Sequence, residues 1–293
     1  MDVDTPTEGI QTASPIAAGS AHARTLIRPP SRWPGLGLRE AWRYRSICLV
    51  LARRNLMVRY RQTAIGVGWV VIQPILLMIV FTVFFGLLGR FPSDGLPYPV
   101  FFFLGLLPWQ MVAKIMSEGS TSVVANSTLV TRVYLPRVYF PTSVAMASLV
   151  DLAFASVALA IMLAVFGIVP GPMVVIVPVL IATALMAGLG MAYWLSALHV
   201  AYRDVGQLLP FLTQLWMFSS PIMYPSSMIP EPYRALYFFN PMALVIGGFR
   251  WAFGGAPPPP AYAWALGTSI AALILVTGYM FFRHRESTFS DLV

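Results

Sequence analysis

Three ionisable side chains lie inside long apolar segments, where charged groups are costly and are functional candidates for that reason. Lys114 and Glu118 are four residues apart, so on a helix they share one face and can form an ion pair. Alternatively, Lys114 lies near a membrane surface and extends its ammonium group into water. Asp151 has no oppositely charged neighbour in sequence. We therefore expect it to meet Lys114 or an arginine from another helix.

The motifs of common catalytic sites are missing from the sequence. It contains no GxxxxGK[ST] phosphate-binding loop, no HExxH metal motif and no GxSxG nucleophile motif. The single cysteine, Cys48, excludes an internal disulfide framework, and His22, His199 and His284 are far apart. We expect no catalytic residue, no metal site and no cofactor in this chain, and no ATP hydrolysis by it.

The composition indicates an integral membrane protein. Of the 293 residues, 58% are apolar and 10% are charged, against about 25% charged residues in soluble domains. The mean hydropathy is +0.73. These values exclude a cytosolic enzyme, a disordered chain and a collagen-like fibre. In a soluble protein the net charge of +8 would suggest nucleic acid, but here the position of the charge along the chain is more informative.

Six segments are long and apolar enough to cross a bilayer, which takes about 20 helical residues. Backbone groups in lipid must be satisfied within a helix or a closed barrel, and these apolar runs are continuous rather than alternating. We therefore predict an all-α fold. The six predicted spans cover residues 66–88, 98–124, 138–166, 173–200, 205–224 and 261–282.

Arginine positions predict the orientation. An even number of spans places both termini on one side. Ten arginines lie between Arg24 and Arg61. The predicted loops and the C-terminal end on the same side of the membrane contain five more arginines, namely Arg132, Arg137, Arg203, Arg283 and Arg285. The other side receives three, Arg90, Arg234 and Arg250. Because positive charge concentrates on the cytoplasmic side, both termini are expected in the cytoplasm.

Two segments precede the predicted transmembrane domain of residues 62–293. Residues 1–35 are rich in Pro, Ser, Thr and Ala and are expected to be a disordered tail. Residues 36–61 are predicted to form a basic amphipathic helix in the plane of the headgroups. Its apolar and basic residues recur at helical spacing: Leu38, Trp42, Leu49 and Leu56, with Arg39, Arg43, Arg53 and Arg54 mostly around the other face. A simpler interpretation is a juxtamembrane charge cluster that only fixes orientation.

Two connecting segments carry helix signals. Asn126 or Ser127 can cap a short helix that must end near Pro136, although the sequence alone favours an inert loop. Between residues 221 and 260 the apolar stretches 233–239 and 241–253 are too short to span. Asn240-Pro241 is a typical helix start and Gly254-Gly255 a helix end. We expect a re-entrant helical hairpin in the outer leaflet; the alternative is a periplasmic loop with interfacial aromatics.

Aromatic residues make up 13% of the chain. Aromatic rings stack on the apolar faces of sugar rings, so as a set they are candidates for lining a channel. For any single residue, packing or an interfacial belt explains the ring equally well. The channel candidates are Trp69, Phe81, Phe85, Trp109, Trp216, Phe218 and Tyr224.

Several blocks together resemble a known family. They are LARRNLMVRYRQTAIGVGW (51–69), QPILLMIVFTVFFG (73–86), VVANSTLVTRVYLPRVYFP (123–141), YRDVGQLLPFLTQLWMFSSPIMYP (202–225) and FNPMALVIGGFR (239–250). The sequence resembles ABC-2 type permeases that export polysaccharides, above all those for lipid-linked O-antigen or teichoic acid.

This resemblance implies the ABC-2 (type V) exporter fold and a homodimer in the bacterial inner membrane. Two copies of a separate ATP-binding cassette subunit would bind ATP and Mg, and membrane lipids would surround the dimer. The substrate would be a polysaccharide linked to undecaprenyl pyrophosphate, not a nucleic acid.

The resemblance also implies roles for individual residues. The helix around residues 129–135 would be the coupling helix, with Leu129, Arg132, Tyr134 and Leu135 near the ATPase. The amphipathic helix would gate substrate entry. Its arginines suit pyrophosphate because guanidinium groups bind phosphate oxygens in a forked geometry; they are Arg53, Arg54, Arg59 and Arg61. The hairpin would close the periplasmic mouth.

Two other functions stay open. One is an ABC-2 exporter of drugs or lipids. The other is a membrane glycosyltransferase or acyltransferase, which would need an acid, histidine or metal constellation that the sequence does not display.

Overall fold

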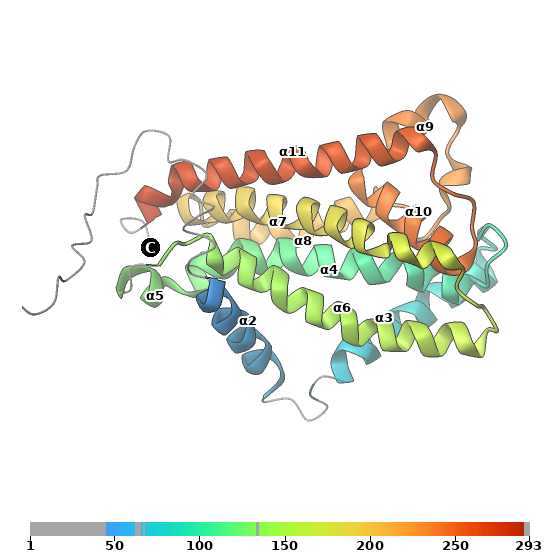
Figure 1. The fold of residues 1–293 in the computed structure, drawn as a ribbon, viewed down its shortest axis with the longest axis horizontal. Helices are drawn as coiled ribbons and strands as arrows, with labels where there is room; N and C mark the ends of the chain where they lie inside the picture. Colours follow the sequence, from blue (N-terminus) through green and yellow to red (C-terminus); the bar gives the residue numbers. More distant parts are fainter. Residues whose placement is uncertain (1–44, 62–65, 67, 133–134, 290–293) are drawn as a thin grey trace, which may run out of the picture. The chain divides into compact units, whose positions relative to one another are not determined.

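The computed structural model describes residues 45–61, 66, 68–132 and 135–289, without the side chains of Arg132 and Ser287. The predicted tail, 1–35, and residues 36–44 of the predicted amphipathic helix lie outside this part. Every regular element of the described residues is a helix (Figure 1). The prediction of an all-α fold therefore holds for this part of the chain.

Five helical segments are long and apolar enough to cross a membrane. They are α3 (Gly68–Phe81) with the π-helix η1 (Thr82–Leu88), α4 (Tyr98–Ala125), α6 (Tyr139–Val165), the 3₁₀-helix η2 (Pro172–Ile176) with α7 (Val177–Ala201), and α11 (Ala261–Arg285). Five of the six predicted spans are thus confirmed as apolar helices of membrane length, with ends within about three residues of the expected ones.

The fifth predicted span differs from the expected continuous helix. Helix α8 covers Val205–Phe218, which is 14 residues or about 21 Å of helix. This is shorter than the hydrocarbon layer of about 30 Å. The chain leaves the helix at Ser219 and Ser220, just before Pro221, because a proline disfavours the helical conformation of the residue before it. The prediction of an uninterrupted helix over 205–224 is wrong.

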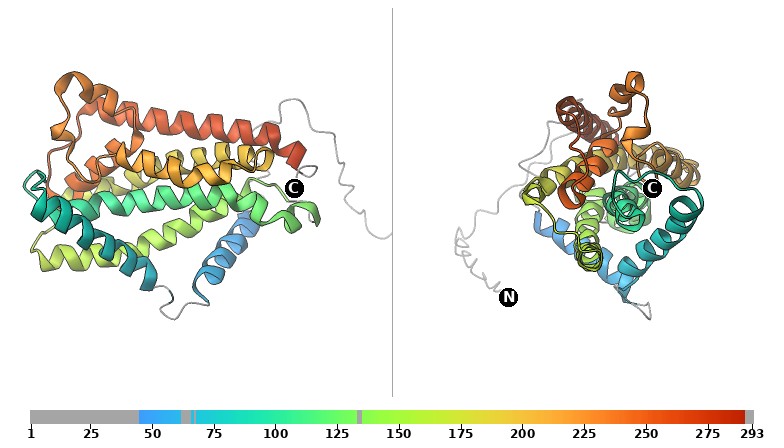
Figure 2. Two further views of the ribbon diagram at one scale, coloured as in Figure 1. Left: turned by 180° about the vertical axis from the view of Figure 1, so that it is seen from behind. Right: turned by 90° about the vertical axis from the view of Figure 1, so that its right-hand side faces the viewer.

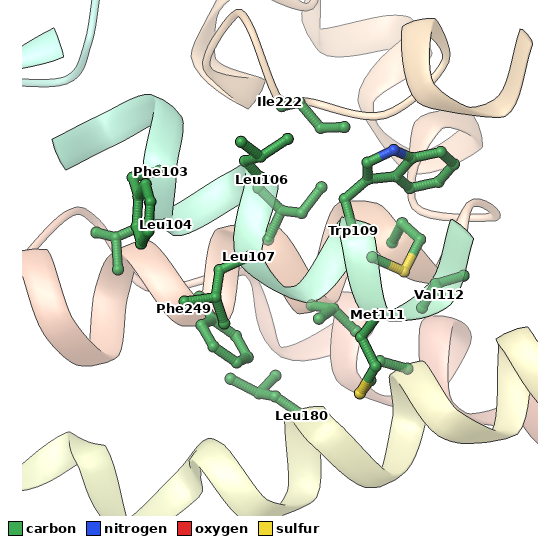
Figure 3. Close-up of a cluster of buried hydrophobic side chains, with 14 of the residues drawn as sticks. Phe103, Leu104, Leu106, Leu107, Trp109, Met111, Val112, Leu180, Ile222 and Phe249 are labelled. Carbon is green, nitrogen blue, oxygen red and sulfur yellow. The ribbon is translucent and has the colours of Figure 1, made fainter. Parts of the chain in front are cut away.

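Helix α4 is the most buried of the long helices and packs against α6, α7 and α10 (Pro241–Gly254). Figure 3 shows α4 side chains such as Leu107 packed near Leu180 of α7 and Phe249 of α10, with Ile222 on another side. All four residues belong to one buried apolar cluster. The core therefore lies around α4, and the other elements are arranged about it (Figure 2).

Helices α7 and α11 approach each other closely through glycines. A Cβ atom at Gly190 would overlap the backbone of α11 at Ile274 and Leu275, and one at Gly278 would overlap the Gly190 carbonyl. Small residues at such crossings let two helix backbones meet. Backbone atoms cannot move aside as a flexible side chain can, so both positions require glycine.

The short helices also follow the sequence signals. Helix α5 covers Ser127–Arg132, and α9 covers Glu231–Tyr237. Helix α10 begins after Asn240, whose side chain accepts a hydrogen bond from the Met242 amide at 3.0 Å. It ends at Gly255, which has a left-handed φ of 68°. Two further 3₁₀ turns, η3 (Ser226–Met228) and η4 (Glu286–Thr288), complete the described elements.

The helix α2 (Arg45–Tyr60) lies against α6. Its packed face carries Cys48, Leu51 and Ala52, which are all buried. Leu49, expected on the apolar face, is 55% exposed within the protomer. The structure thus has a helix over 45–60 of the predicted range 36–61. The side of this helix that packs on the protein also carries Asn55 and Arg59, which bind residues of α6.

We predict that Gly278→Val lowers the stability of the folded protein by about 1–3 kcal/mol, because the added atoms overlap backbone rather than a movable side chain. Thermal unfolding in detergent, followed by size-exclusion chromatography, measures this loss.

The matched control is Gly171→Val, since Gly171 has an ordinary φ of −76° and no neighbouring atom within 4 Å of an added Cβ. Equal melting temperatures for Gly278→Val and the wild type would contradict the close approach of α7 and α11.

A second prediction concerns the only cysteine. Cys48 is 4% exposed, and burial raises the pKa of its thiol to about 11. Because the thiolate is the reactive form, at pH 8 roughly one thiol in a thousand is ionised. We expect very slow alkylation by N-ethylmaleimide, with a rate that rises with pH until about 11.

Mass spectrometry of the folded protein measures this rate, and the same protein unfolded in SDS is the control. Labelling of folded protein within minutes at pH 8 would show that Cys48 is not buried between α2 and α6.

Candidate functional site

The intramembrane carboxylate Asp151 of α6 binds three groups from two other helices. It accepts hydrogen bonds from Lys114 Nζ of α4 at 2.6 Å and from the Tyr60 hydroxyl of α2 at 2.6 Å. Arg59 of α2 also forms an ion pair with it. The Asp151 side chain is only 8% exposed. Both expected types of partner, Lys114 and an arginine from another helix, therefore meet this carboxylate.

Glu118 completes the network through a different contact from the one expected. The second terminal nitrogen of Arg59 donates to Glu118, while Lys114 binds Asp151. The predicted pair between Lys114 and Glu118 does not form. An exposed pair within one helix contributes only about 0.2–0.5 kcal/mol. Neutralising the buried carboxylate of Asp151 avoids a much larger desolvation cost, so Lys114 turns toward it.

The network carries two positive and two negative charges and links α2, α4 and α6. Burial acts to lower the pKa of Arg59, but Glu118, Tyr60 and Asp151 outweigh this effect and raise the pKa. Burial and the hydrogen bond to Asp151 raise the pKa of Tyr60 to about 12. At neutral pH, Arg59 is therefore charged and Tyr60 is a neutral hydrogen-bond donor.

A cavity of about 350 Å³ lies beside the network. Its walls come from α3, α4, α6 and α8, and Lys114, Glu118 and Asp151 line it together with uncharged polar groups. These are Gln73, Gln110, Ser117, Ser148 and Thr213. A cavity of this size is in the range of small-ligand sites, and its polar walls suit a ligand with many hydrogen-bonding groups.

The four arginines expected to bind pyrophosphate divide into two pairs. Arg59 is held by carboxylates, and Arg54 donates to the side chain of Asn126 at the end of α4. Arg53 and Arg61 are exposed. Two of the four thus connect α2 to α4 and α6, and the pyrophosphate role of these arginines stays a prediction.

Of the expected coupling residues, Leu129 lies in the short helix α5 and Leu135 follows it. Both are half-buried and pack against a cluster that includes Val123 and Val138. Tyr134 and the side chain of Arg132 lie outside the described residues. The coupling role of these positions stays a prediction.

The candidate channel aromatics differ in how deeply they are buried. Trp109 is buried within the protomer and meets Trp216 edge-on at 5.7 Å (Figure 3 shows Trp109 in the core). Phe81 stacks on Phe85 and on Phe102. Within the protomer the ring of Trp109 packs α4 against α8, and its assignment as a channel-lining residue stays a prediction.

Trp69 and Phe218 are exposed, while Tyr224 is half-buried and its hydroxyl lies 3.4 Å from that of Tyr237. The lining role of these aromatics stays a prediction.

Sequence reasoning missed the burial of Arg250. This arginine was counted only as one of three on the non-cytoplasmic side, and the structure shows it buried in α10. Its guanidinium donates to the carbonyls of Phe101 at 3.2 Å and Ile222 at 2.9 Å. The available signal was its place inside the apolar stretch 241–253. Arg250 joins α10, α4 and the segment after α8.

Asn240 has a similar joining role. Beyond capping α10, it accepts a hydrogen bond from Trp216 Nε1 at 3.0 Å and donates to Ser219 and Ser220. One side chain thus fixes the end of α8 to the start of α10.

In the residues that the structure describes, no group of three or more His, Cys, Asp or Glu side chains is placed to hold a metal ion.

Comparison with known proteins gives one family and several relatives. The ABC-2 type transporter family matches residues 47–253. The chain is 28% identical to the O-antigen export system permease protein RfbA of Myxococcus xanthus, over 87% of this chain and 98% of that protein. It is 27% identical to a Klebsiella pneumoniae protein of the same name, over 71% and 80%.

A more distant relative is the polysialic acid transport protein KpsM of Escherichia coli, which is 23% identical over 66% of this chain and 75% of that protein.

We predict that Asp151→Asn destabilises the protein, because it leaves Lys114 and Arg59 without their shared buried carboxylate. Breaking a buried ion pair costs about 3–5 kcal/mol. Since the Lys114 side chain is 28% exposed, we expect about 2–3 kcal/mol. Thermal unfolding in detergent checks this value.

The double variant Asp151→Asn with Lys114→Gln should recover part of the loss, because the uncompensated ammonium is removed as well. The carboxylate-to-amide control is Glu231→Gln at an exposed position. Strictly additive effects of the two substitutions would contradict the ion pair.

Proposed function

The chain belongs to the ABC-2 type transporter family, and we propose that it is the permease subunit of an ABC exporter for lipid-linked polysaccharide. The substrate would be an O-antigen-like polymer on undecaprenyl pyrophosphate that crosses the bacterial inner membrane. Similarity along nearly the whole length of a Myxococcus xanthus O-antigen export permease carries this proposal. A polar cavity between membrane-length helices fits the same function.

The energy for export would come from ATP hydrolysis by a separate partner protein. In the proposed assembly, two copies of this chain form a homodimer, and two ATP-binding cassette subunits bind ATP and Mg. The segment around α5 would receive the movement of the ATPase, because it directly continues α4 through Asn126. A shift of this short segment would then reach the buried centre of the protomer without an intervening loop.

We further propose six passes with both termini in the cytoplasm. The short helix α8 would cross together with the segment that follows it. Helices α9 and α10 would enter the outer leaflet without crossing. Hydrogen bonds from Asn240 and Arg250 satisfy the irregular backbone around Ser219 and Ile222, which is the condition for non-helical backbone at membrane depth.

Carrier recognition would involve only part of the arginine cluster. Arg53 and Arg61 are exposed on or just after α2, so their guanidinium groups are available to phosphate oxygens. Arg54 and Arg59 would instead hold α2 in place through Asn126, Glu118 and Asp151.

Deletion of the gene in its native host tests the function. Lipid-linked polymer should accumulate on the cytoplasmic face, and surface polysaccharide should fall, as measured by immunoblotting of lipid and surface fractions. Normal surface polysaccharide in the deletion strain would contradict the proposal. ATP-independent turnover of a lipid-linked sugar by the purified chain would instead indicate an enzyme.

We predict that Arg53→Glu with Arg61→Glu reduces export at least tenfold while the melting temperature changes little, because exposed side chains contribute little to stability. Export is measured by complementation of the deletion strain. Arg90→Glu, at an exposed position in the loop between η1 and α4, is the control for reversal of an exposed charge and should export normally. Wild-type export by the double variant would remove the pyrophosphate role.

A further inference from the structure

One face of α4 carries a continuous line of polar side chains. Its members are Gln110, Lys114, Ser117, Glu118 and Thr121. Their separations of three or four residues place them along one side of a helix. On the rest of α4, most side chains are buried and apolar. A helix buried this deeply gains nothing from a polar face unless that face meets water or a polar ligand.

The polar face borders two cavities that share residues. The cavity beside Asp151 has a volume of about 350 Å³. The second, more open cavity has about 580 Å³ and lies between α4 and α8. Ser117, Glu118 and Thr213 line both. The two cavities therefore form one groove along α4, which we call the α4 groove.

Uncharged hydrogen-bonding side chains line both parts of the α4 groove, beside apolar side chains that form most of the wall of the second cavity. Gln73 of α3 and Gln214 of α8 face it from the two sides. The amides of Gln110, Gln73 and Gln214 can each donate and accept, as can the hydroxyls of Ser117 and Thr213. Sugar hydroxyls need both kinds of partner, so these side chains match a carbohydrate better than a lipid tail.

The charges at the groove cancel. Lys114 lines it with Glu118 and Asp151, and Arg59 pairs with both carboxylates. Two cations thus balance two anions. An acidic polymer gains no net attraction from this arrangement and would compete with the internal ion pairs for Lys114 and Arg59.

We propose that the α4 groove of each protomer is a binding site for uncharged sugar residues of the exported polymer. This inference rests on the proposed function and adds the location and the sugar class. Ser117 and Glu118 occupy the junction of the two cavities and contact the sugar directly. The buried ring of Trp109 has no part in this contact. Hydrogen bonding from amides and hydroxyls, rather than ring stacking alone, holds the polymer at this depth.

The first experiment fills the groove. Ser117→Trp, assayed for export in the deletion strain, should reduce export at least tenfold, because the indole fills the junction of the two cavities. Leu273→Trp, at an exposed position of α11 away from the groove, is the size-matched control. Wild-type export by a folded Ser117→Trp protein would overturn the groove and leave the proposed function intact. Loss of export on deletion of the gene tests that function separately.

The second experiment does not depend on a bulky residue being tolerated. Single cysteines at Ser117 and Gln214, in the full complex with its ATPase, are labelled with a charged methanethiosulfonate; Cys48 is buried and does not interfere. Short neutral mannan oligosaccharides should slow labelling at least threefold, and oligosialic acid should not. Leu273→Cys reports any unspecific effect. Equal rates with and without mannan, or equal protection by oligosialic acid, would overturn the proposal.

Discussion

The ionised carboxylate of Asp151, held among apolar helices, is the constraint on which much of the structure depends. A charge in such surroundings is tolerated only when it is paired and hydrogen-bonded. Lys114 and Arg59 supply the opposite charge, and Tyr60 supplies a neutral donor. Because these partners come from α2 and α4, one buried group determines where an amphipathic surface helix sits on the bundle.

The same requirement shapes α4. This helix must bury aromatic and aliphatic side chains against α6, α7 and α10 and also present Lys114 and Glu118 to polar partners. On the apolar side of α4, helix α7 in turn packs closely against α11 through glycines. The polar side stays open between α3 and α8, where the cavities lie. Helix α4 therefore has a packed apolar side and an open polar side along its length.

Much of the fold could be predicted from the sequence, because helix ends depend on local signals. Asn240-Pro241 and Gly254-Gly255 bounded α10 correctly since caps and left-handed glycines act over a few residues. The length of α8 was wrong because its apolar run continues past the turn that Pro221 enforces. Apolarity alone does not distinguish a helix from the buried turn after it.

The candidate site was less predictable, because its contacts join residues distant in sequence. Spacing suggested that Lys114 pairs with Glu118, but the choice of Asp151 depends on how α4 and α6 meet. The same holds for Arg59, whose partners lie 59 and 92 residues away. The burial of Arg250 was not predicted, for a different reason. Counting arginines by loop ignores that a guanidinium satisfied by two backbone carbonyls can be fully enclosed.

The shallow burial of α3 and α8 has a mechanical consequence. Only about 6% of the most apolar window of Gly68–Leu88 is buried within the protomer, and Leu209 is the buried residue of α8. Segments with few buried apolar contacts open at low free-energy cost. Each of the two helices contacts α4 on one side only, α3 through Phe81 on Phe102 and α8 through Trp216 on Trp109. The protomer thus combines a well-packed bundle of α4, α6, α7 and α11 with two less buried helices, α3 and α8, which border the polar face of α4.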